Sequence, residues 1–148
     1  LGTGDLFDTT KIVEDIRNKN PNVEVLLTGL RREYIISKLK EKDIPYRYFN
    51  MVSLTEINDL YNCLDLYIVS SRVEGGPRAI VEAGFCKVPI ISTDVGIASE
   101  FLPKESIYDV DDWKSYKDAT PNVDKVFENV KHLDINHQIK VIRDFLIN

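Results

Sequence analysis

Two glutamates and two glycines near the middle of the chain carry the clearest chemical signal. Glu74 is followed by Gly75 and Gly76, and Glu82 lies eight residues after Glu74. Pro77 predicts the start of a helix after this loop, because proline is favoured at the first helical position. Glycines let a ligand approach the backbone closely, and the free N–H groups of a helix start attract anions. The sequence therefore predicts a phosphate site at this loop.

The two carboxylates flank that expected phosphate site. Glu82 lies about five residues into the helix, a rise of roughly 7.5 Å at ~1.5 Å per residue, and Glu74 precedes the helix. Carboxylates accept strong hydrogen bonds from hydroxyl groups. A nucleotide-diphosphate sugar fits this arrangement, with its ribose at Glu82 and its sugar at Glu74. Arg78, at the second helical position, is a candidate to neutralise the phosphates.

Each of these residues also has a structural interpretation. An acidic side chain near a helix start is stabilised by the helix dipole by ~0.3–1 kcal/mol without any ligand. Glu82 and Arg78 fit an exposed helix surface equally well, and Gly75 and Gly76 fit a simple turn. Gly29, which follows an earlier predicted strand, either forms a turn or lines the nucleotide pocket.

A second acidic motif, Asp109-Val110-Asp111, has the D-x-D spacing that can hold a divalent metal against a diphosphate. Its place at the end of a late strand favours helix capping instead. His132 and His137 do not share a helical face, and no acid or cysteine completes a site with them. We therefore predict no metal site.

The elements that position these residues alternate between strands and helices. Expected helices cover 31–42, 54–65 and a segment from 77, after a first helix that Asp8, Thr9 and Thr10 cap. Continuous or β-rich apolar runs predict strands over 23–28, 46–52, 66–70 and 88–92, with a further one over 106–110. Residues 111–148 are expected to form a helical segment. Repeated β-α units predict an α/β fold, a doubly wound open parallel sheet with ligands at the carboxyl ends of its strands.

Composition places the chain among ordinary globular proteins. Its 148 residues carry a net charge of −5 and are 43% hydrophobic, which fits one domain and excludes a basic nucleic-acid-binding surface. No apolar stretch approaches the ~20 residues that span a membrane. Two unpaired cysteines, Cys63 and Cys86, favour a reducing compartment and predict a cytoplasmic location. The chain opens at Leu1 in what reads as a strand-to-loop transition, so we expect a piece of a longer protein.

The segment from Ser70 to Pro103 resembles the donor-binding half of retaining GT-B glycosyltransferases of family 4. Seven residues separate its two glutamates, which gives an E-x7-E motif. The other parts of the resemblance are Ser71-x-x-Glu74-Gly75, Glu82-Ala83, Val88-Pro89-Ile90-Ile91, and Thr93-Asp94-Val95-Gly96 followed by Glu100. A looser resemblance covers residues 1–103.

This resemblance implies a C-terminal Rossmann-like domain that binds an activated sugar without a metal or other cofactor. Glu74 would be catalytic, and the donor-binding residues would be Glu82, Gly75, Gly76, Arg78, Gly29, Gly2 and Thr3. The sequence departs from the family pattern at Thr3 and Phe7, where two basic residues usually neutralise the diphosphate. It departs again at Met51, which replaces a glycine.

We expect residues 1–148 to be the nucleotide-sugar-binding domain of a retaining hexosyltransferase. Its partner would be an N-terminal acceptor-binding domain in the parent chain, which is either fully cytoplasmic or peripheral at a membrane. The isolated domain would bind the donor without turnover. Two alternatives stay open: half of a nucleotide-sugar epimerase, or a non-catalytic sugar-nucleotide-binding or interaction module. The missing cations at Thr3 and Phe7 motivate the second alternative.

Overall fold

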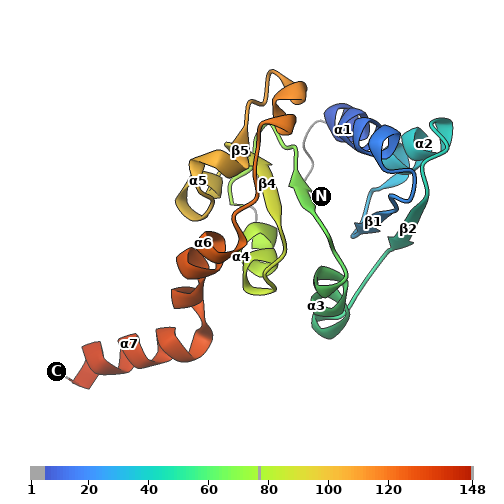
Figure 1. Cartoon of the computed structure of the whole chain (residues 1–148). Helices are drawn as coiled ribbons and strands as arrows, with labels where there is room; N and C mark the ends of the chain where they lie inside the picture. The colour runs from blue at the N-terminus through green and yellow to red at the C-terminus, as the bar shows by residue number, and fades with distance from the viewer. Residues whose placement is uncertain (1–5, 77, 148) are drawn as a thin grey trace.

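The computed structural model describes residues 6–76 and 78–147 and confirms the predicted alternation of helices and strands (Figure 1). In the first half the elements are α1 (Leu6–Lys19), β1 (Val25–Thr28), α2 (Glu33–Glu41), β2 (Tyr46–Phe49), α3 (Leu54–Asn62) and β3 (Tyr67–Val69). In the second half they are α4 (Arg78–Phe85), β4 (Ile90–Thr93), α5 (Ala98–Phe101), η1 (Lys104–Ser106), β5 (Ile107–Tyr108), η2 (Trp113–Lys117), α6 (Val123–Val130), η3 (Lys131–Leu133) and α7 (Ile135–Ile147).

All strand pairs among the described residues are parallel, which confirms the α/β class. The pairs form two sheets, one with the order β1-β2 and one with the order β3-β4-β5. The sequence predicts one open sheet, which would contain both β1 and β3. Among the described residues, however, no strand pairs with both of them. The strand expected over 46–52 ends at Phe49, because Asn50 and Met51 lie in a bend and Met51 is 76% exposed.

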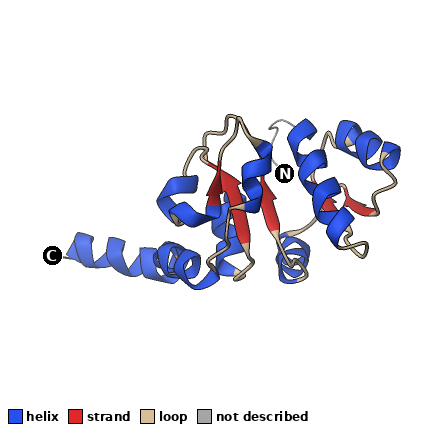
Figure 2. Ribbon diagram, turned by 45° about the horizontal axis from the view of Figure 1, so that its top comes forward, coloured by secondary structure: helices blue, strands red, loops and turns tan. Residues whose placement is uncertain are grey.

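The larger core covers one face of the three-stranded sheet. Every residue of β4 is buried, and Ile80 and Ala83 of α4 lie in one cluster with Ile90 of β4. At Gly84 a Cβ would lie 3.0 Å from a methyl of Val126 and 3.3 Å from one of Val130. Glycine therefore lets α4 approach α6 closely. Figure 2 shows helices around this sheet, with α7 extending away from it.

The first helix differs from its predicted start. Thr9 and Thr10, expected as caps, lie inside α1 and are buried. The Thr9 hydroxyl is hydrogen-bonded to the Ser70 hydroxyl, directly after β3. This long-range contact explains why the local capping signal was wrong, since the polar side chain has a tertiary partner. Within the described residues, no helix combines the length and apolar character needed to cross a membrane.

Candidate functional site

The loop that follows β3 is held by neighbouring elements. The Thr93 hydroxyl, at the end of β4, donates a hydrogen bond of 2.6 Å to the backbone carbonyl of Ser71. Ser70, one residue earlier, is held by the Thr9 hydroxyl of α1. Both serines are buried. The loop therefore leaves the carboxyl end of β3 on a fixed path, which is where parallel sheets bind ligands.

Glu74 lies at the middle of this loop, and its side chain is oriented from within it. The half-buried Glu74 accepts a hydrogen bond of 3.0 Å from the Ser71 hydroxyl. Gly75 and Gly76 are exposed, and no protein atom lies within 4 Å of a Cβ built on Gly75. At Gly76 the nearest atom is a methyl of Ile97, at 4.0 Å. The surroundings leave room for a ligand, and the role of both glycines in binding stays a prediction.

Glu82 reaches the same neighbourhood from α4. The Tyr61 hydroxyl donates a hydrogen bond of 2.9 Å to Oε2 of Glu82. Tyr61 is buried in the core beneath, and this burial, with the nearby negative charges, raises the pKa of Tyr61 above its usual range. The bond fixes one oxygen of an otherwise exposed carboxylate. Tyr61 was not predicted as a site residue, because in the sequence it occupies an ordinary position in an apolar helical stripe.

Tyr67 links the two glutamates electrostatically. Its ring packs edge-on against Tyr61, with 5.9 Å between ring centroids. Burial raises the pKa of Tyr67 to about 12, the charges of Glu74 and Glu82 add to the rise, and Arg32 opposes it. The titration of this one ring is therefore influenced by two carboxylates and one guanidinium. The structure thus brings together two residues that the motif predicted and one cation that it did not.

That cation, Arg32, comes from the loop after β1. Its Nε donates a hydrogen bond of 2.8 Å to the Thr28 carbonyl, and its side chain is half-buried. Within the part of the chain that the structure describes, no carboxylate forms an ion pair with Arg32. The remaining guanidinium N–H groups are therefore available for an anion. In the sequence, the two consecutive arginines that follow the strand-ending glycine could have indicated this cation.

The other predicted donor-binding residues are distributed as follows. Gly29 has a φ of +86° and accepts a hydrogen bond of 2.9 Å from the Tyr48 hydroxyl, so the turn itself favours glycine. Arg78 is exposed, and it opens α4. Gly2 and Thr3 lie outside the described residues.

The D-x-D residues have structural partners. Asp111 forms an ion pair of 2.9 Å with Arg72, and Asp109 accepts a hydrogen bond from the Asp111 backbone. The residue that caps η2 is the next one, Asp112, which accepts a hydrogen bond from the Lys114 backbone. Among the residues that the structure covers, no group of three or more His, Cys, Asp or Glu side chains could hold a metal.

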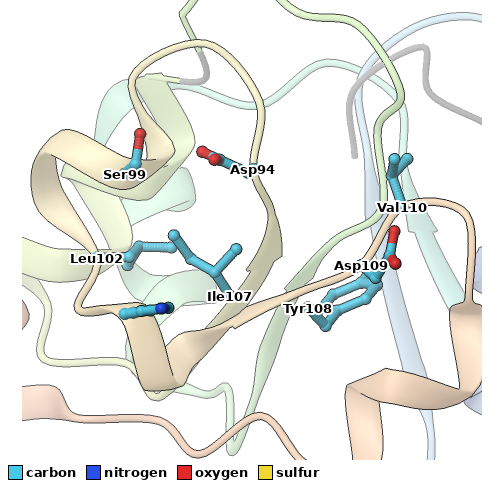
Figure 3. Close-up of a pocket in the computed structure, with 8 residues that line it drawn as sticks. Asp94, Ser99, Leu102, Ile107, Tyr108, Asp109 and Val110 are labelled. Carbon is cyan, nitrogen blue, oxygen red and sulfur yellow. The ribbon is translucent and has the colours of Figure 1, made fainter.

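A cavity of about 590 Å³ lies beside β5 and the loop after β4 (Figure 3). Its lining residues are Asp94, Ser99, Leu102, Lys104, Ile107, Tyr108, Asp109 and Val110. In Figure 3, the carboxylate of Asp94 and the hydroxyl of Ser99 lie on one side of the cavity, and the carboxylate of Asp109 lies on the other. Glu74 and Glu82 are not part of this lining, so the cavity is separate from the motif.

Comparison with known proteins identifies similarity at two levels. A family model described as glycosyl transferases group 1 matches residues 6–134. No curated protein matches the chain. Among solved structures, the catalytic domain of cholesterol-alpha-glucosyltransferase from Helicobacter pylori is 15% identical with a TM-score of 0.65, and the match covers 93% of this chain and 85% of that one.

Two further structures resemble the chain over a smaller part of their own length. S. aureus TarM, solved as a variant with fondaparinux, alpha-GlcNAc-glycerol and UDP, has a TM-score of 0.67 at 14% identity, covering 99% of this chain. AviGT4, a glycosyltransferase of avilamycin A biosynthesis, has a TM-score of 0.56 at 14% identity, covering 90%. The chain spans 33% of the first and 43% of the second. At these identities the likeness establishes the Rossmann-like fold.

Proposed function

Because the chain belongs to the glycosyl transferases group 1 family, we propose that it is the nucleotide-sugar donor-binding domain of a retaining hexosyltransferase. One observation carries the proposal: Glu82, on α4, is held by Tyr61, whose ring packs against Tyr67, and the charges of Glu82 and of Glu74, in the loop after β3, both raise the pKa of Tyr67. This juxtaposition fits a ligand with hydroxyls at two points. The similarity to a glucosyltransferase and to a protein solved with UDP supports a sugar nucleotide as that ligand.

Each residue has a distinct task in this proposal. Glu82 accepts hydrogen bonds from the ribose, and Glu74 orients the sugar at the reacting centre. Gly75, Gly76 and the start of α4 bind the diphosphate, with Arg78 beside them. Arg32 supplies a second cation in place of the two basic residues that the family carries at the positions of Thr3 and Phe7.

The chemistry rests on orientation and on stabilisation of the leaving diphosphate. Donors held in place before the reaction stabilise charge as it develops, without reorganisation at that moment. This chemistry requires no metal, and no side chain is assigned as a covalent nucleophile. Transfer itself depends on an acceptor-binding domain in the parent chain, so the 148-residue chain should bind donor without turnover. A cytoplasmic location of the parent protein stays a prediction.

Calorimetric titration with uridine, guanosine and adenosine diphosphate sugars tests the donor site directly. We expect saturable binding for at least one of them and none after Glu74 and Glu82 are both changed to alanine. A flat response to every donor would contradict the proposal. Chelation with EDTA should leave the binding unchanged, whereas a strict manganese requirement would restore a metal role for Asp109 and Asp111.

Assays of the parent protein separate transfer from the two alternatives. Incubation with the donor that binds should yield a sugar joined to an acceptor with retained anomeric configuration. A change of configuration within the free nucleotide sugar would identify an epimerase instead. Binding without either product would identify a non-catalytic module.

A further inference from the structure

The cavity beside β5 has the size and composition of a small-molecule site, and its lining shares no residue with the candidate donor site. Its volume of about 590 Å³ lies within the roughly 300–1,000 Å³ of such sites, which are mostly apolar with a few polar groups. In its lining, Leu102 and Tyr108 are buried, and Ile107 and Val110 are half-buried. These side chains offer an apolar wall to one face of a ligand.

Three polar side chains of this lining have no partner among the described residues. Asp94, Ser99 and Lys104 are exposed, and across residues 6–76 and 78–147 their side chains make no hydrogen bond or ion pair. Asp109, across the cavity from Asp94 in Figure 3, uses one carboxylate oxygen for the Asp111 backbone amide. The cavity therefore offers acceptors on two sides, and donors from a hydroxyl and an ammonium group.

These groups exclude several classes of ligand. Two carboxylates and one ammonium group give the lining a net charge of −1, which disfavours phosphate and other anions. The Tyr108 ring is buried and its hydroxyl donates to the Val69 carbonyl at 2.9 Å, so this ring is not exposed for stacking on a nucleobase. A neutral ligand with several hydroxyl groups fits, because each hydroxyl both donates and accepts hydrogen bonds.

Both sides of the cavity are joined to the loop of residues 71–74, which ends at the candidate catalytic glutamate. Asp94 directly follows Thr93, whose hydroxyl donates a hydrogen bond of 2.6 Å to the first carbonyl of that loop. Across the cavity, the carboxylate of Asp111, whose amide holds Asp109, pairs at 2.9 Å with the arginine of the loop. The cavity therefore lies beside the candidate donor site.

We propose that this cavity binds one neutral sugar ring other than that of the donor. Ring hydroxyls donate to Asp94 and Asp109, Ser99 and Lys104 donate to ring oxygens, and the C–H face of the ring packs on the apolar wall. The ligand belongs to the class of carbohydrate acceptors. Its part in transfer, though not its binding, rests on the proposed function.

NMR titration of the ¹⁵N-labelled chain tests the site with three probes, the methyl α-pyranosides of glucose, galactose and mannose. They differ in the orientation of single hydroxyls. We expect saturable shifts of the backbone amides of Asp94, Ser99 and Asp109 with at least one of them. The 6-phosphate of the sugar that binds should bind more weakly, because the lining is negatively charged. Tighter binding of the phosphate, or no saturable shift with any probe, would overturn the proposal.

Two variants and a control locate the binding. Asp94→Ala should weaken the sugar at least about tenfold, since a hydrogen bond to a charged group contributes that much. Ser99→Ala is a second, smaller truncation and should also weaken it. The control Asp59→Ala removes an exposed carboxylate from α3 and should leave affinity unchanged. Unchanged affinity in both cavity variants, or shifts confined to the loop of residues 71–74, would contradict the site.

Failure of this site can be distinguished from failure of the donor site. The sugar titrations contain no nucleotide, and the variant with both Glu74 and Glu82 changed to alanine should still bind the sugar probe. Adding the diphosphate sugar that binds in calorimetry should not displace the probe. Displacement would show that the cavity takes the sugar of the donor, and would overturn the proposal while supporting the donor site.

Discussion

The two sheets differ in how deeply their strands are buried. All four residues of β4 are buried, whereas in β1 only Leu27 is buried and in β2 none is. Glu74 and Glu82 stand on the more buried sheet, and Arg32 stands on the other. The acidic part of the candidate site is therefore built on a densely packed scaffold, and one of its cations on a scaffold with much less packing. Substitutions in the two regions should therefore have different effects on stability and on ligand binding.

The largest expected effect is on the stability of the buried sheet. Ile80 is fully buried between α4 and β4, so Ile80→Ala should lower the free energy of unfolding by about 2–5 kcal/mol through lost burial and a cavity. Leu26→Ala is the matched change in the half-buried β1 and should cost less, about 1 kcal/mol. Urea unfolding of both variants measures the difference. Equal losses would remove the distinction between the two sheets.

Loss of charge at Glu82 should have the second-largest effect. Glu82→Gln keeps an acceptor oxygen for the Tyr61 hydroxyl but weakens hydrogen bonds from ribose. Affinity should fall by about 1.5–3 kcal/mol, and by the same amount for nucleoside and nucleotide. Glu128→Gln, on α6 and paired there with Lys131, is the control and should leave calorimetric affinity unchanged. A loss confined to the diphosphate would argue against a ribose contact.

Removal of either arginine tests whether both sheets contribute to phosphate binding. Arg32→Ala and Arg78→Ala should each weaken nucleoside diphosphate by about 1 kcal/mol and leave the bare nucleoside unaffected. The loss should shrink as salt is added, because exposed charges are screened. Titrations at low and high salt measure this. An effect of Arg78 alone would confine the phosphate site to the three-stranded sheet.

The smallest effect concerns the titration of Tyr67. Its pKa is raised from 10.0 to about 12, so the neutral phenol is favoured in the folded state. The associated stability is complete below pH 10 and is lost as the pH rises through about 12. Glu74→Gln should lower this pKa and Arg32→Ala should raise it, since the two charges act in opposite directions. NMR titration of ¹³C-labelled tyrosine follows the ring directly, and identical pKa values in both variants would contradict the shared neighbourhood.

Local patterns in the sequence were sufficient for most elements. The β-rich run before Gly29 and the helical spacing of Ile35 and Leu39 correctly predicted β1 and the inward face of α2. The capping signal at Thr9 was wrong because its hydroxyl partner, Ser70, is 61 residues away. Propensity and periodicity describe a few neighbouring residues, so a distant partner leaves no trace in them.

The same distinction between neighbouring and distant residues applies to the candidate site. The sequence by itself determined the E-x7-E spacing, the helix that starts between the glutamates and the strands on either side, because these depend on residues close together in the chain. The tertiary structure decided that Tyr61 holds Glu82 and that the charges of Arg32 and both glutamates act on the pKa of Tyr67. It also decided that the strands pair as two sheets. The physical reason is that burial, charge effects and strand pairing join residues through space, and only packing of the whole chain brings them together.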